Sequence, residues 1–329
     1  MSYLIHNFAA LTGTGLIKGA VYGLVALGYT LVYGVLRLIN FAHSEVFMWG
    51  SFAAVWALAA IGAGPNPSPL EIALLLLVAL VAATAVSGAT ALVVERVAYR
   101  RLIRLKAPPL TALISAIGMS FVLGEIMGLR DKITGWVGLD GTLHLYVSGA
   151  RDNTRFANPL QSRILFNIGN YGVSNIDLLV LGCALVMMVA LDQFIRRSRL
   201  GRGIRAVAQD SDAAALMGVN KQQVIRVTFL IGGVMAGAAA LLYLMKFGVT
   251  RWNAGFLLGV KAFTAAVLGG IGNVRGALLG GFVLGLAENY GSAIVGSQWQ
   301  DVVAFVLLIV ILLFRPTGLL GESLGRARA

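Results

Sequence analysis

Long apolar stretches alternate with short polar ones along almost the whole chain. Each stretch approaches the ~20 residues that a helix needs to cross the hydrocarbon core of a bilayer. Nine such runs lie at about 12–36, 45–63, 70–95, 109–128, 176–195, 224–245, 255–271, 276–296 and 300–315. The pattern predicts an all-α, polytopic membrane protein with eight to ten transmembrane helices, because glycines in the first, seventh and eighth runs could turn one run into a half-helix.

The composition agrees with this pattern and excludes an ordinary soluble domain. Only 12% of the 329 residues are charged, against roughly 25% in soluble proteins. In a soluble protein the net charge of +12 would suggest a nucleic-acid partner. Here the basic residues gather between apolar runs, as the positive-inside rule describes, so we expect contact with the lipid bilayer and none with nucleic acid.

The distribution of Lys and Arg predicts the orientation of the chain. Basic residues are concentrated at 97–107 and 196–226, so both segments should be cytoplasmic. Residues 1–17 contain no Lys or Arg. With nine crossings, the N-terminus would therefore lie outside and the C-terminus inside. The segment 129–175 mixes basic and acidic residues, and we expect it to form an external, polar and partly structured loop.

Glycines recur at a spacing of four residues within several apolar runs. In lipid, helices gain little from hydrophobicity when they associate, but small residues let their backbones approach closely. The spacing therefore predicts tight helix packing, and the alternative is that these glycines let helices slide during transport. The pairs are Gly19 and Gly23, Gly233 and Gly237, Gly276 and Gly280, and Gly281 and Gly285.

The sequence contains no motif for catalysis or nucleotide binding. It has no G-x-x-x-x-G-K-[ST] loop for ATP phosphates and no G-x-S-x-G nucleophile elbow, and its three histidines share no metal-ligand spacing. We therefore expect a protein that is not an enzyme and that holds no cofactor or metal of its own. A membrane-bound enzyme and an ion-coupled secondary transporter are the alternatives. The transporter would need paired intramembrane acids, and only Glu125 and Glu288 qualify.

One polar stretch, LGRGIRAVAQDSDAAALMGVN, lies between two long apolar runs. It predicts a helix from about Arg202 to Ala208 and a second helix from Asp212 to Met217. Asp210-Ser211 should cap the start of the second helix, and Gly218 should end it in a left-handed conformation.

The apolar side chains of these two helices are expected to face inward: Ile204, Val207, Leu216 and Met217. Two interpretations fit the polar face. The helices could lie among lipid headgroups, held by their arginines. Alternatively, the acidic residues and the run of small alanines favour a docking surface for another protein.

Several blocks of the sequence match a known family. Asp212-Ala213-Ala214 followed by Gly218 fits the E-A-A-x-x-x-G spacing of ABC importer permeases, with Asp in place of Glu. The other matching blocks are YGLVALGYTLVY at 22–33, LINFAHSE at 38–45, LGRGIRAVAQDSDAAALMGVN at 200–220, KAFTAAVLGGIGNVRG at 261–276 and FRPTG at 314–318. Together they span most of the chain, which resembles the LivH-type permease subunits of the branched-chain amino acid ABC importers.

The resemblance implies a single transmembrane permease domain over 1–329, located in a bacterial plasma (inner) membrane. It also implies a homologous second permease subunit, two cytoplasmic ABC ATPases that use the ATP, and a periplasmic or lipid-anchored binding protein that delivers the substrate. Because relatives import urea or short amides with similar permeases, those substrates stay open beside branched-chain amino acids. The coupling segment, 196–223, would contact the ATPases through Arg202, Arg205, Asp210, Asp212, Ala213, Ala214 and Gly218.

Three polar residues between the first two apolar runs are candidates for the translocation path or its gate. Asn40, His43 and Glu45 could form a polar break that lines the path. The alternative is a cytoplasmic turn in which Ser44, where the family usually has Gly, caps the next helix and the helix dipole favours the glutamate.

Glu288 lies inside the eighth apolar run, where an ionisable side chain is a functional candidate by default. It could meet the ammonium group of a transported amino acid. The structural alternative is an ion pair with Lys261 or Arg275.

Overall fold

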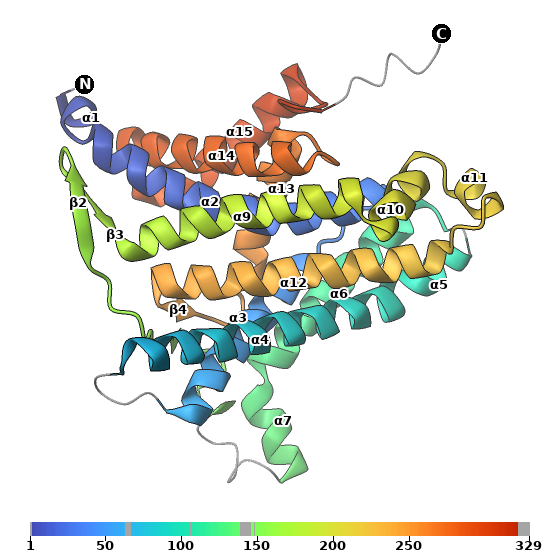
Figure 1. Ribbon diagram of the computed structural model, residues 1–329, viewed down its shortest axis with the longest axis horizontal. Helices are drawn as coiled ribbons and strands as arrows, with labels where there is room; N and C mark the ends of the chain where they lie inside the picture. Colours follow the sequence, from blue (N-terminus) through green and yellow to red (C-terminus); the bar gives the residue numbers. More distant parts are fainter. Residues whose placement is uncertain (1, 63–66, 106, 139–145, 148, 322–329) are drawn as a thin grey trace. The chain divides into compact units, whose positions relative to one another are not determined.

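We describe a computed structural model of the chain, which covers residues 2–62, 67–105, 107–138, 146–147 and 149–321. Helices dominate it (Figure 1). Their bounds are α1 Ser2–His6, α2 Phe8–Leu36, α3 His43–Ile61, α4 Pro69–Val94, the π-helix η1 Glu95–Tyr99, α5 Arg100–Arg104, α6 Pro109–Gly128, α7 Arg130–Val137, α9 Asn175–Arg197, α10 Arg199–Gln209, α11 Ser211–Leu216, α12 Lys221–Phe247, α13 Ala254–Gly269, α14 Val274–Val295, the 3-10 helix η2 Ser297–Trp299 and α15 Gln300–Phe314.

Four short strands form two antiparallel pairs. β1 (Thr154–Arg155) pairs with β4 (Val249–Thr250), and β2 (Ile164–Ile168) pairs with β3 (Tyr171–Ser174). With α7, three of these strands lie in the segment 129–175, so the described part of the predicted loop is partly structured as expected. Residues 139–145 and 148 of that loop lie outside the described residues.

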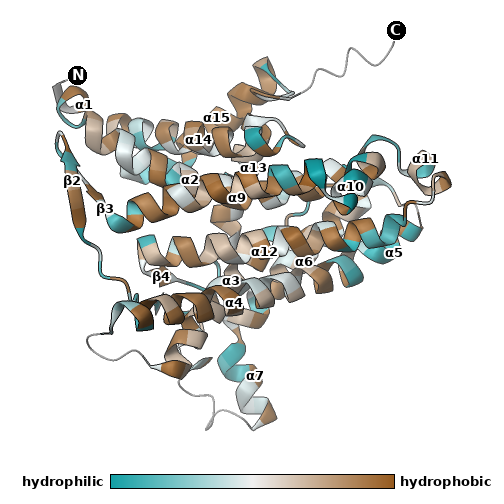
Figure 2. Cartoon of the chain, viewed as in Figure 1, coloured by the Kyte–Doolittle hydropathy of each residue, from teal (hydrophilic) through white to brown (hydrophobic). Residues whose placement is uncertain are grey.

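A helix covers most of every predicted apolar run, and Figure 2 shows hydrophobic residues along the long helices. Within the described residues, 8 helices are long and apolar enough to cross a membrane. The seventh run forms α13, which has only 16 residues. The count agrees with the prediction of eight to ten helices. The short seventh run is one of the three in which glycines were expected to allow a half-helix.

Polar caps set the beginnings of several long helices. Ser68 and Glu71 form a capping box around the first turn of α4, where Pro69 occupies a position that needs no N–H donor. The side chain of Asn273 accepts hydrogen bonds from the backbone N–H of Arg275 and Gly276, both at 3.1 Å, and so caps α14. These caps satisfy N–H groups that would otherwise be unpaired at a helix start.

By their contacts the residues form two compact units. Unit 1 comprises Met1–Arg37, Ser162–Thr228 and Val260–Ala329, and unit 2 comprises Leu38–Gln161 and Phe229–Gly259. That the two units work as one permease domain stays a prediction.

Unit 1 is built on close packing of α2 against α14 (Figure 1). A Cβ atom added at Gly19 would lie 2.6 Å from the carbonyl oxygen of Gly281, and one added at Gly281 would lie 2.5 Å from the backbone N of Gly23. No side chain fits between these backbones. The predicted role of both glycine pairs in helix packing is therefore confirmed. Gly280 likewise packs against the backbone of α13, at Ala265.

In unit 2, glycines allow the same close approach of helix backbones between α4 and α12. A Cβ at Gly237 would lie 2.5 Å from the carbonyl oxygen of Ala83, and one at Gly233 would lie 2.7 Å from that of Ser87. Beside this contact, Met48, Phe52 and Met127 form a fully buried apolar cluster between α3 and α6, with Trp49, Trp56 and Trp252 packed against it.

Candidate functional site

The coupling segment forms the two predicted short helices, with earlier starts than expected. α10 begins at Arg199 because the Ser198 hydroxyl accepts a hydrogen bond from Gly201 N at 2.8 Å. α11 begins at Ser211 because the Asp210 carboxylate accepts from Asp212 N at 2.9 Å and Ala213 N at 3.0 Å. These backbone hydrogen bonds hold the pKa of Asp210 below its usual value. Asp210 alone is therefore the cap, and Ser211 belongs to the helix.

Gly218 adopts the predicted left-handed conformation, with φ at +84°. It ends the turn after α11, and nothing lies within 4 Å of the place where its Cβ would be. Its importance is therefore one of backbone conformation alone, because L-residues other than glycine rarely adopt this φ.

The prediction for the apolar side chains of this segment is half right. Ile204 and Val207 on α10 are buried, but Leu216 and Met217 are 89% and 85% exposed. The physical reason is that α11 has only six residues and packs through the small side chain of Ala214, which is 4% exposed. Its last residues therefore point away from the rest of unit 1.

The same two helices also expose charged side chains. Arg202, Arg205 and Asp212 are all exposed, and Figure 2 shows hydrophilic residues concentrated on α10. Arg205 also donates to the carbonyl oxygen of Ile195. Lys221 lies 3.6 Å from Asp212 and donates to the Ser211 hydroxyl at 2.8 Å, which fixes α11 against the start of α12.

A hollow of about 340 Å³ opens beside these helices. It is lined by basic, polar and small apolar side chains of α10 and of the start of α12 with the turn before it: Arg199, Leu200, Arg202, Gly203, Ala206, Val219, Asn220, Gln223 and Val224. All lining residues belong to unit 1. The coupling segment thus presents a mixed charged and apolar surface with a depression.

The polar break between α2 and α3 is buried. Asn40, His43 and Glu45 are 3%, 1% and 3% exposed. The hydroxyl of Tyr99 lies 3.1 Å from the carbonyl oxygen of Ile39 and 3.3 Å from the side-chain oxygen of Asn40, and donates to them. A turn in cytoplasmic water would expose these side chains, so the burial argues against that alternative.

Ser44 does not cap α3. Its hydroxyl donates to the carbonyl oxygen of Phe41 at 2.8 Å, and Ala42 occupies the cap position without a side-chain hydrogen bond. The expected cap is therefore wrong. The serine lies inside the first turn of the helix, where its hydroxyl reaches back to the preceding carbonyl rather than forward to free N–H groups.

Only one of the two carboxylate oxygens of Glu45 has a hydrogen-bond partner among the described residues. Its Oε1 accepts a hydrogen bond from Ser120 Oγ on α6 at 3.3 Å. Its Oε2 is buried and has no hydrogen-bond partner within the part of the chain that the structure describes. A Cβ at Gly255 would lie 2.6 Å from this Oε2, so glycine there lets the backbone approach the carboxylate.

Glu288 lies at the centre of an ion-pair cluster in unit 1. It is 0% exposed, and Lys261 Nζ donates to its Oε1 at 2.9 Å. Tyr22 OH donates to the same oxygen at 3.1 Å, and the Gln300 amide also donates to it. Lys261 further pairs with Asp301 at 2.7 Å. Lys18 also interacts electrostatically with Glu288 and Lys261.

Of the two ion-pair partners predicted for Glu288, Lys261 is confirmed and Arg275 is wrong. Arg275 instead pairs with Asp192 on α9 at 2.9 Å. Two further acids of the long helices also form ion pairs. Glu95 pairs with Arg100 at 2.6 Å, and Glu125 pairs with Arg151 at 3.1 Å.

Comparison with known proteins decides the family. The family described as branched-chain amino acid transport system / permease component matches residues 11–312. The chain belongs to this family. The high-affinity branched-chain amino acid transport system permease protein BraD of Pseudomonas aeruginosa is 41% identical over 326 residues, 97% of this chain and 97% of that protein.

Other relatives of this permease agree. The LivH permease proteins of Salmonella typhimurium and Escherichia coli K12, described as parts of the same high-affinity system, are 40% and 39% identical over 310 residues, 94% of this chain and 94% of each relative. Among solved structures, PsaBC from Streptococcus pneumoniae in complex with Fab covers 92% of this chain and 91% of its own, at 10% identity and a TM-score of 0.46.

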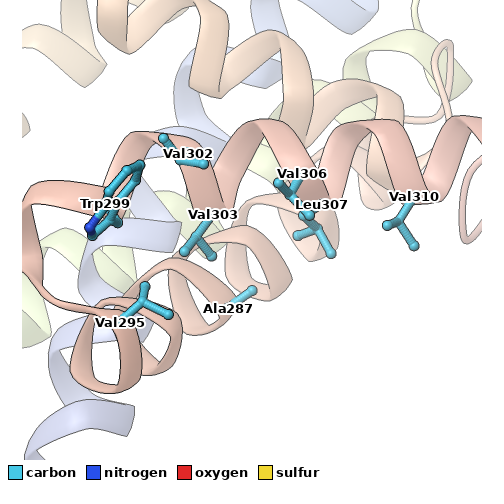
Figure 3. A pocket seen from close by; sticks show the side chains of 8 residues that line it. All are labelled: Ala287, Val295, Trp299, Val302, Val303, Val306, Leu307 and Val310. Atoms are coloured by element: carbon cyan, nitrogen blue, oxygen red, sulfur yellow. The ribbon is translucent and has the colours of Figure 1, made fainter.

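The permease also carries an apolar groove between α14 and α15 in unit 1 (Figure 3). Its volume is about 540 Å³, and Trp299 and Val310 mark its two ends. The lining is Ala287, Val295, Trp299, Val302, Val303, Val306, Leu307 and Val310. The lining offers no carboxylate, cation or hydroxyl group, so the groove has nothing to hold the charged groups of an amino acid.

In the segment 129–175, Arg130 is buried, although it is charged. Its guanidinium donates to the carbonyl oxygens of Met127 at 3.1 Å, Ala150 at 2.6 Å and Gly149 at 3.3 Å. Burial lowers the pKa of this guanidinium from its usual value. The arginine joins the end of α6 to the described part of the loop, and we assign it a structural role.

Sequence reasoning missed the residues that surround the two buried glutamates. Ser120 and Gly255 approach Glu45 from distant parts of the chain, as Tyr22 and Gln300 approach Glu288. A polar or small residue in an apolar run is a weak signal, and it does not indicate which acid the residue will meet. Within the described residues, no group of three or more His, Cys, Asp or Glu side chains could hold a metal.

Proposed function

We propose that this chain is the transmembrane permease subunit of an ATP-driven importer of branched-chain amino acids. The observation that carries the proposal is the family match over nearly the whole chain, with relatives such as BraD that are named as permeases of this transport system. In this function the chain supplies the path through the membrane and performs no chemical step itself. ATP would be bound and hydrolysed by partner subunits.

Two cytoplasmic ABC ATPases are the proposed partners of the coupling segment. The support is physical: Leu216 and Met217 are exposed beside charged side chains on a short, well-capped helix pair. Apolar side chains exposed to this degree are stabilised when a partner covers them. The same proposal places α10 and α11 in the cytoplasm, the N-terminus outside, and the segment 129–175 on the side of an external binding protein.

A homologous second permease subunit completes the proposed complex, in a bacterial plasma membrane. Urea or a short amide is the alternative substrate, because similar permeases serve both classes. An ion-coupled secondary transporter has less support, because Glu125 and Glu288 are each engaged in an ion pair with a basic residue.

Uptake in cells that lack only this chain tests the proposal. Labelled leucine and labelled urea are supplied in parallel at micromolar concentration, with and without restoration of the chain. We expect restoration to recover leucine uptake and to leave urea uptake unchanged. Recovery of urea uptake alone would assign the substrate to the urea-type relatives. Recovery that survives loss of the ATPase subunits would contradict ATP-driven import.

A further inference from the structure

We propose that Glu45 is a binding site for the ammonium group of the transported amino acid. The proposal rests on the proposed function, and it names a residue that would recognise the substrate inside the permease. It is argued within unit 2, to which Glu45 and the residues named beside it belong.

The first step is a comparison of the buried glutamates in the membrane helices. Three are at most 3% exposed: Glu45, Glu95 and Glu288. Glu95 has Arg100 as its cation, and Glu288 has Lys261. In the described part of the chain, Glu45 has no Lys or Arg within ion-pair distance. Because an isolated buried charge is costly, a carboxyl group at such a position is either protonated or paired with a cation from elsewhere, and the proposal takes the second case.

The second step is the geometry of the free oxygen. The hydrogen bond from Ser120 fixes Oε1 and leaves Oε2 without a partner among the described residues. Gly124 lies one helical turn beyond Ser120 on α6, and it is buried. A Cβ atom at Gly124 would meet only Glu45 Oε2, at 3.9 Å, so the space beside this oxygen is not filled by another side chain there. An ammonium group is compact, so it can occupy this space and donate a hydrogen bond to Oε2.

The third step is the position of the carboxylate on its two helices. Glu45 is the third residue of α3, and its partner Ser120 lies midway along the 20-residue helix α6. The start of one helix therefore meets the middle of another. Helix starts that meet other helices in this way are typical of transporter substrate sites, and the positive end of the α3 dipole offsets part of the cost of the buried charge.

The fourth step concerns the substrate's side chain. Met48 and Phe52 follow Glu45 on the next two turns of α3, and they belong to the apolar cluster of unit 2. Methionine side chains adapt readily to different apolar shapes. An amino acid that places its ammonium on Glu45 would thus have an apolar neighbourhood one turn away, as a branched aliphatic side chain requires and urea does not.

Labelling of an introduced cysteine tests the cation site. In the assembled transporter, Cys183→Ser removes the single native cysteine, and Gly124→Cys places a thiol beside Glu45. Gly118→Cys is the matched control, because this exposed glycine lies on the same helix with nothing within 4 Å of its Cβ position. The probes are a cationic aminoethyl and an anionic sulfonatoethyl methanethiosulfonate reagent.

At position 124 we expect the cationic reagent to react at least about tenfold faster than the anionic one, as attraction and repulsion by one nearby carboxylate imply. Glu45→Gln in the same background should abolish this preference. Saturating leucine during turnover should slow labelling at 124 and leave labelling at 118 unchanged. Equal reaction of both reagents, as beside an uncharged carboxyl group, would overturn the proposal, and so would labelling that leucine does not affect.

Uptake kinetics decide the question if the cysteine at 124 is inaccessible or prevents folding. Glu45→Gln should lower the rate of leucine uptake at subsaturating leucine about tenfold or more, the low end of what one hydrogen bond to a charged group contributes to binding. Glu125→Gln, an exposed acid on α6, is the control and should transport normally at equal membrane levels. Normal leucine uptake by the Glu45→Gln variant refutes the proposal. Failure of the unaltered chain to restore leucine uptake refutes the proposed function instead.

Discussion

Replacement of Lys261 by methionine should be one of the most destabilising single changes in unit 1. Glu288 is fully buried, and Lys261 is the cation that lies 2.9 Å from its Oε1. Removal of this cation leaves a buried charge that the hydrogen bonds from Tyr22 and Gln300 and the charge of Lys18, which forms no ion pair with it, only partly compensate. Breaking a buried pair in this way costs about 3–5 kcal/mol of unfolding free energy. The lost pair with Asp301, which is half exposed, adds at most about 1 kcal/mol.

Removal of the acid instead of the cation should cost much less unfolding free energy. In Glu288→Gln, Lys261 keeps its ion pair with Asp301 at 2.7 Å, so no charge is left unpaired. The expected cost is about 1–3 kcal/mol, because one hydrogen bond to a charged group is weakened. In the double variant the buried charge is gone, so its cost should be at least about 2 kcal/mol below the sum of the two single costs.

Denaturation of the purified transporter in detergent measures these free energies, and membrane levels in cells provide an independent check. Because the cluster has a structural role in this reasoning, Glu288→Gln should also transport leucine at a normal rate. Equal costs for the two single variants, or strict additivity in the double variant, would refute the account of the buried pair. Changed substrate preference in Glu288→Gln would instead place that residue on the path.

Three further predictions concern the coupling segment and the helix packing. Gly218→Val should insert normally but lose substrate-stimulated ATP hydrolysis, because a β-branched residue at a φ of +84° costs about 1–3 kcal/mol of strain; normal stimulation would contradict this. Joint Leu216→Ser and Met217→Ser should reduce copurification of the ATPases without lowering membrane levels, since neither side chain packs inside the chain. Gly281→Ala should cost about 1–3 kcal/mol of stability, whereas Gly182→Ala, with nothing within 4 Å of its Cβ position, should cost little.

Most of the fold could be predicted because its signals are local. A run of apolar residues indicates a spanning helix whatever its neighbours are, and the cap at Asp210 and the left-handed Gly218 each depend on a few adjacent residues. The side that a short helix buries is not local. Leu216 and Met217 were expected to face inward from their hydrophobicity, but Ala214 makes the packing contact.

The candidate site could be predicted only in part, and for a related reason. The sequence identifies Glu45 and Glu288 as acids near or inside apolar runs, but one carboxylate meets Ser120 and the other meets Lys261, both far away in the chain. Those contacts depend on which helices pack together. A single sequence contains both residues of such a pair but does not indicate that they are in contact.

The partners of the two acids decide which of them can serve a moving substrate. An ammonium group that approached Glu288 would have to displace Lys261, and it would exchange one ion pair for another with little net gain. At Glu45 no cation of the described chain has to leave, so the whole interaction is available to the substrate. Both carboxylates have one oxygen without a hydrogen-bond partner among the described residues, so the fixed cation is what distinguishes them. A carboxylate with a fixed cation suits a rigid helix contact, whereas one without a cation suits a ligand that binds and departs. Of the two interpretations of Glu288 that the sequence leaves open, the ion pair with Lys261 is therefore the one the structure supports, and Glu45 is the better candidate for the ammonium group.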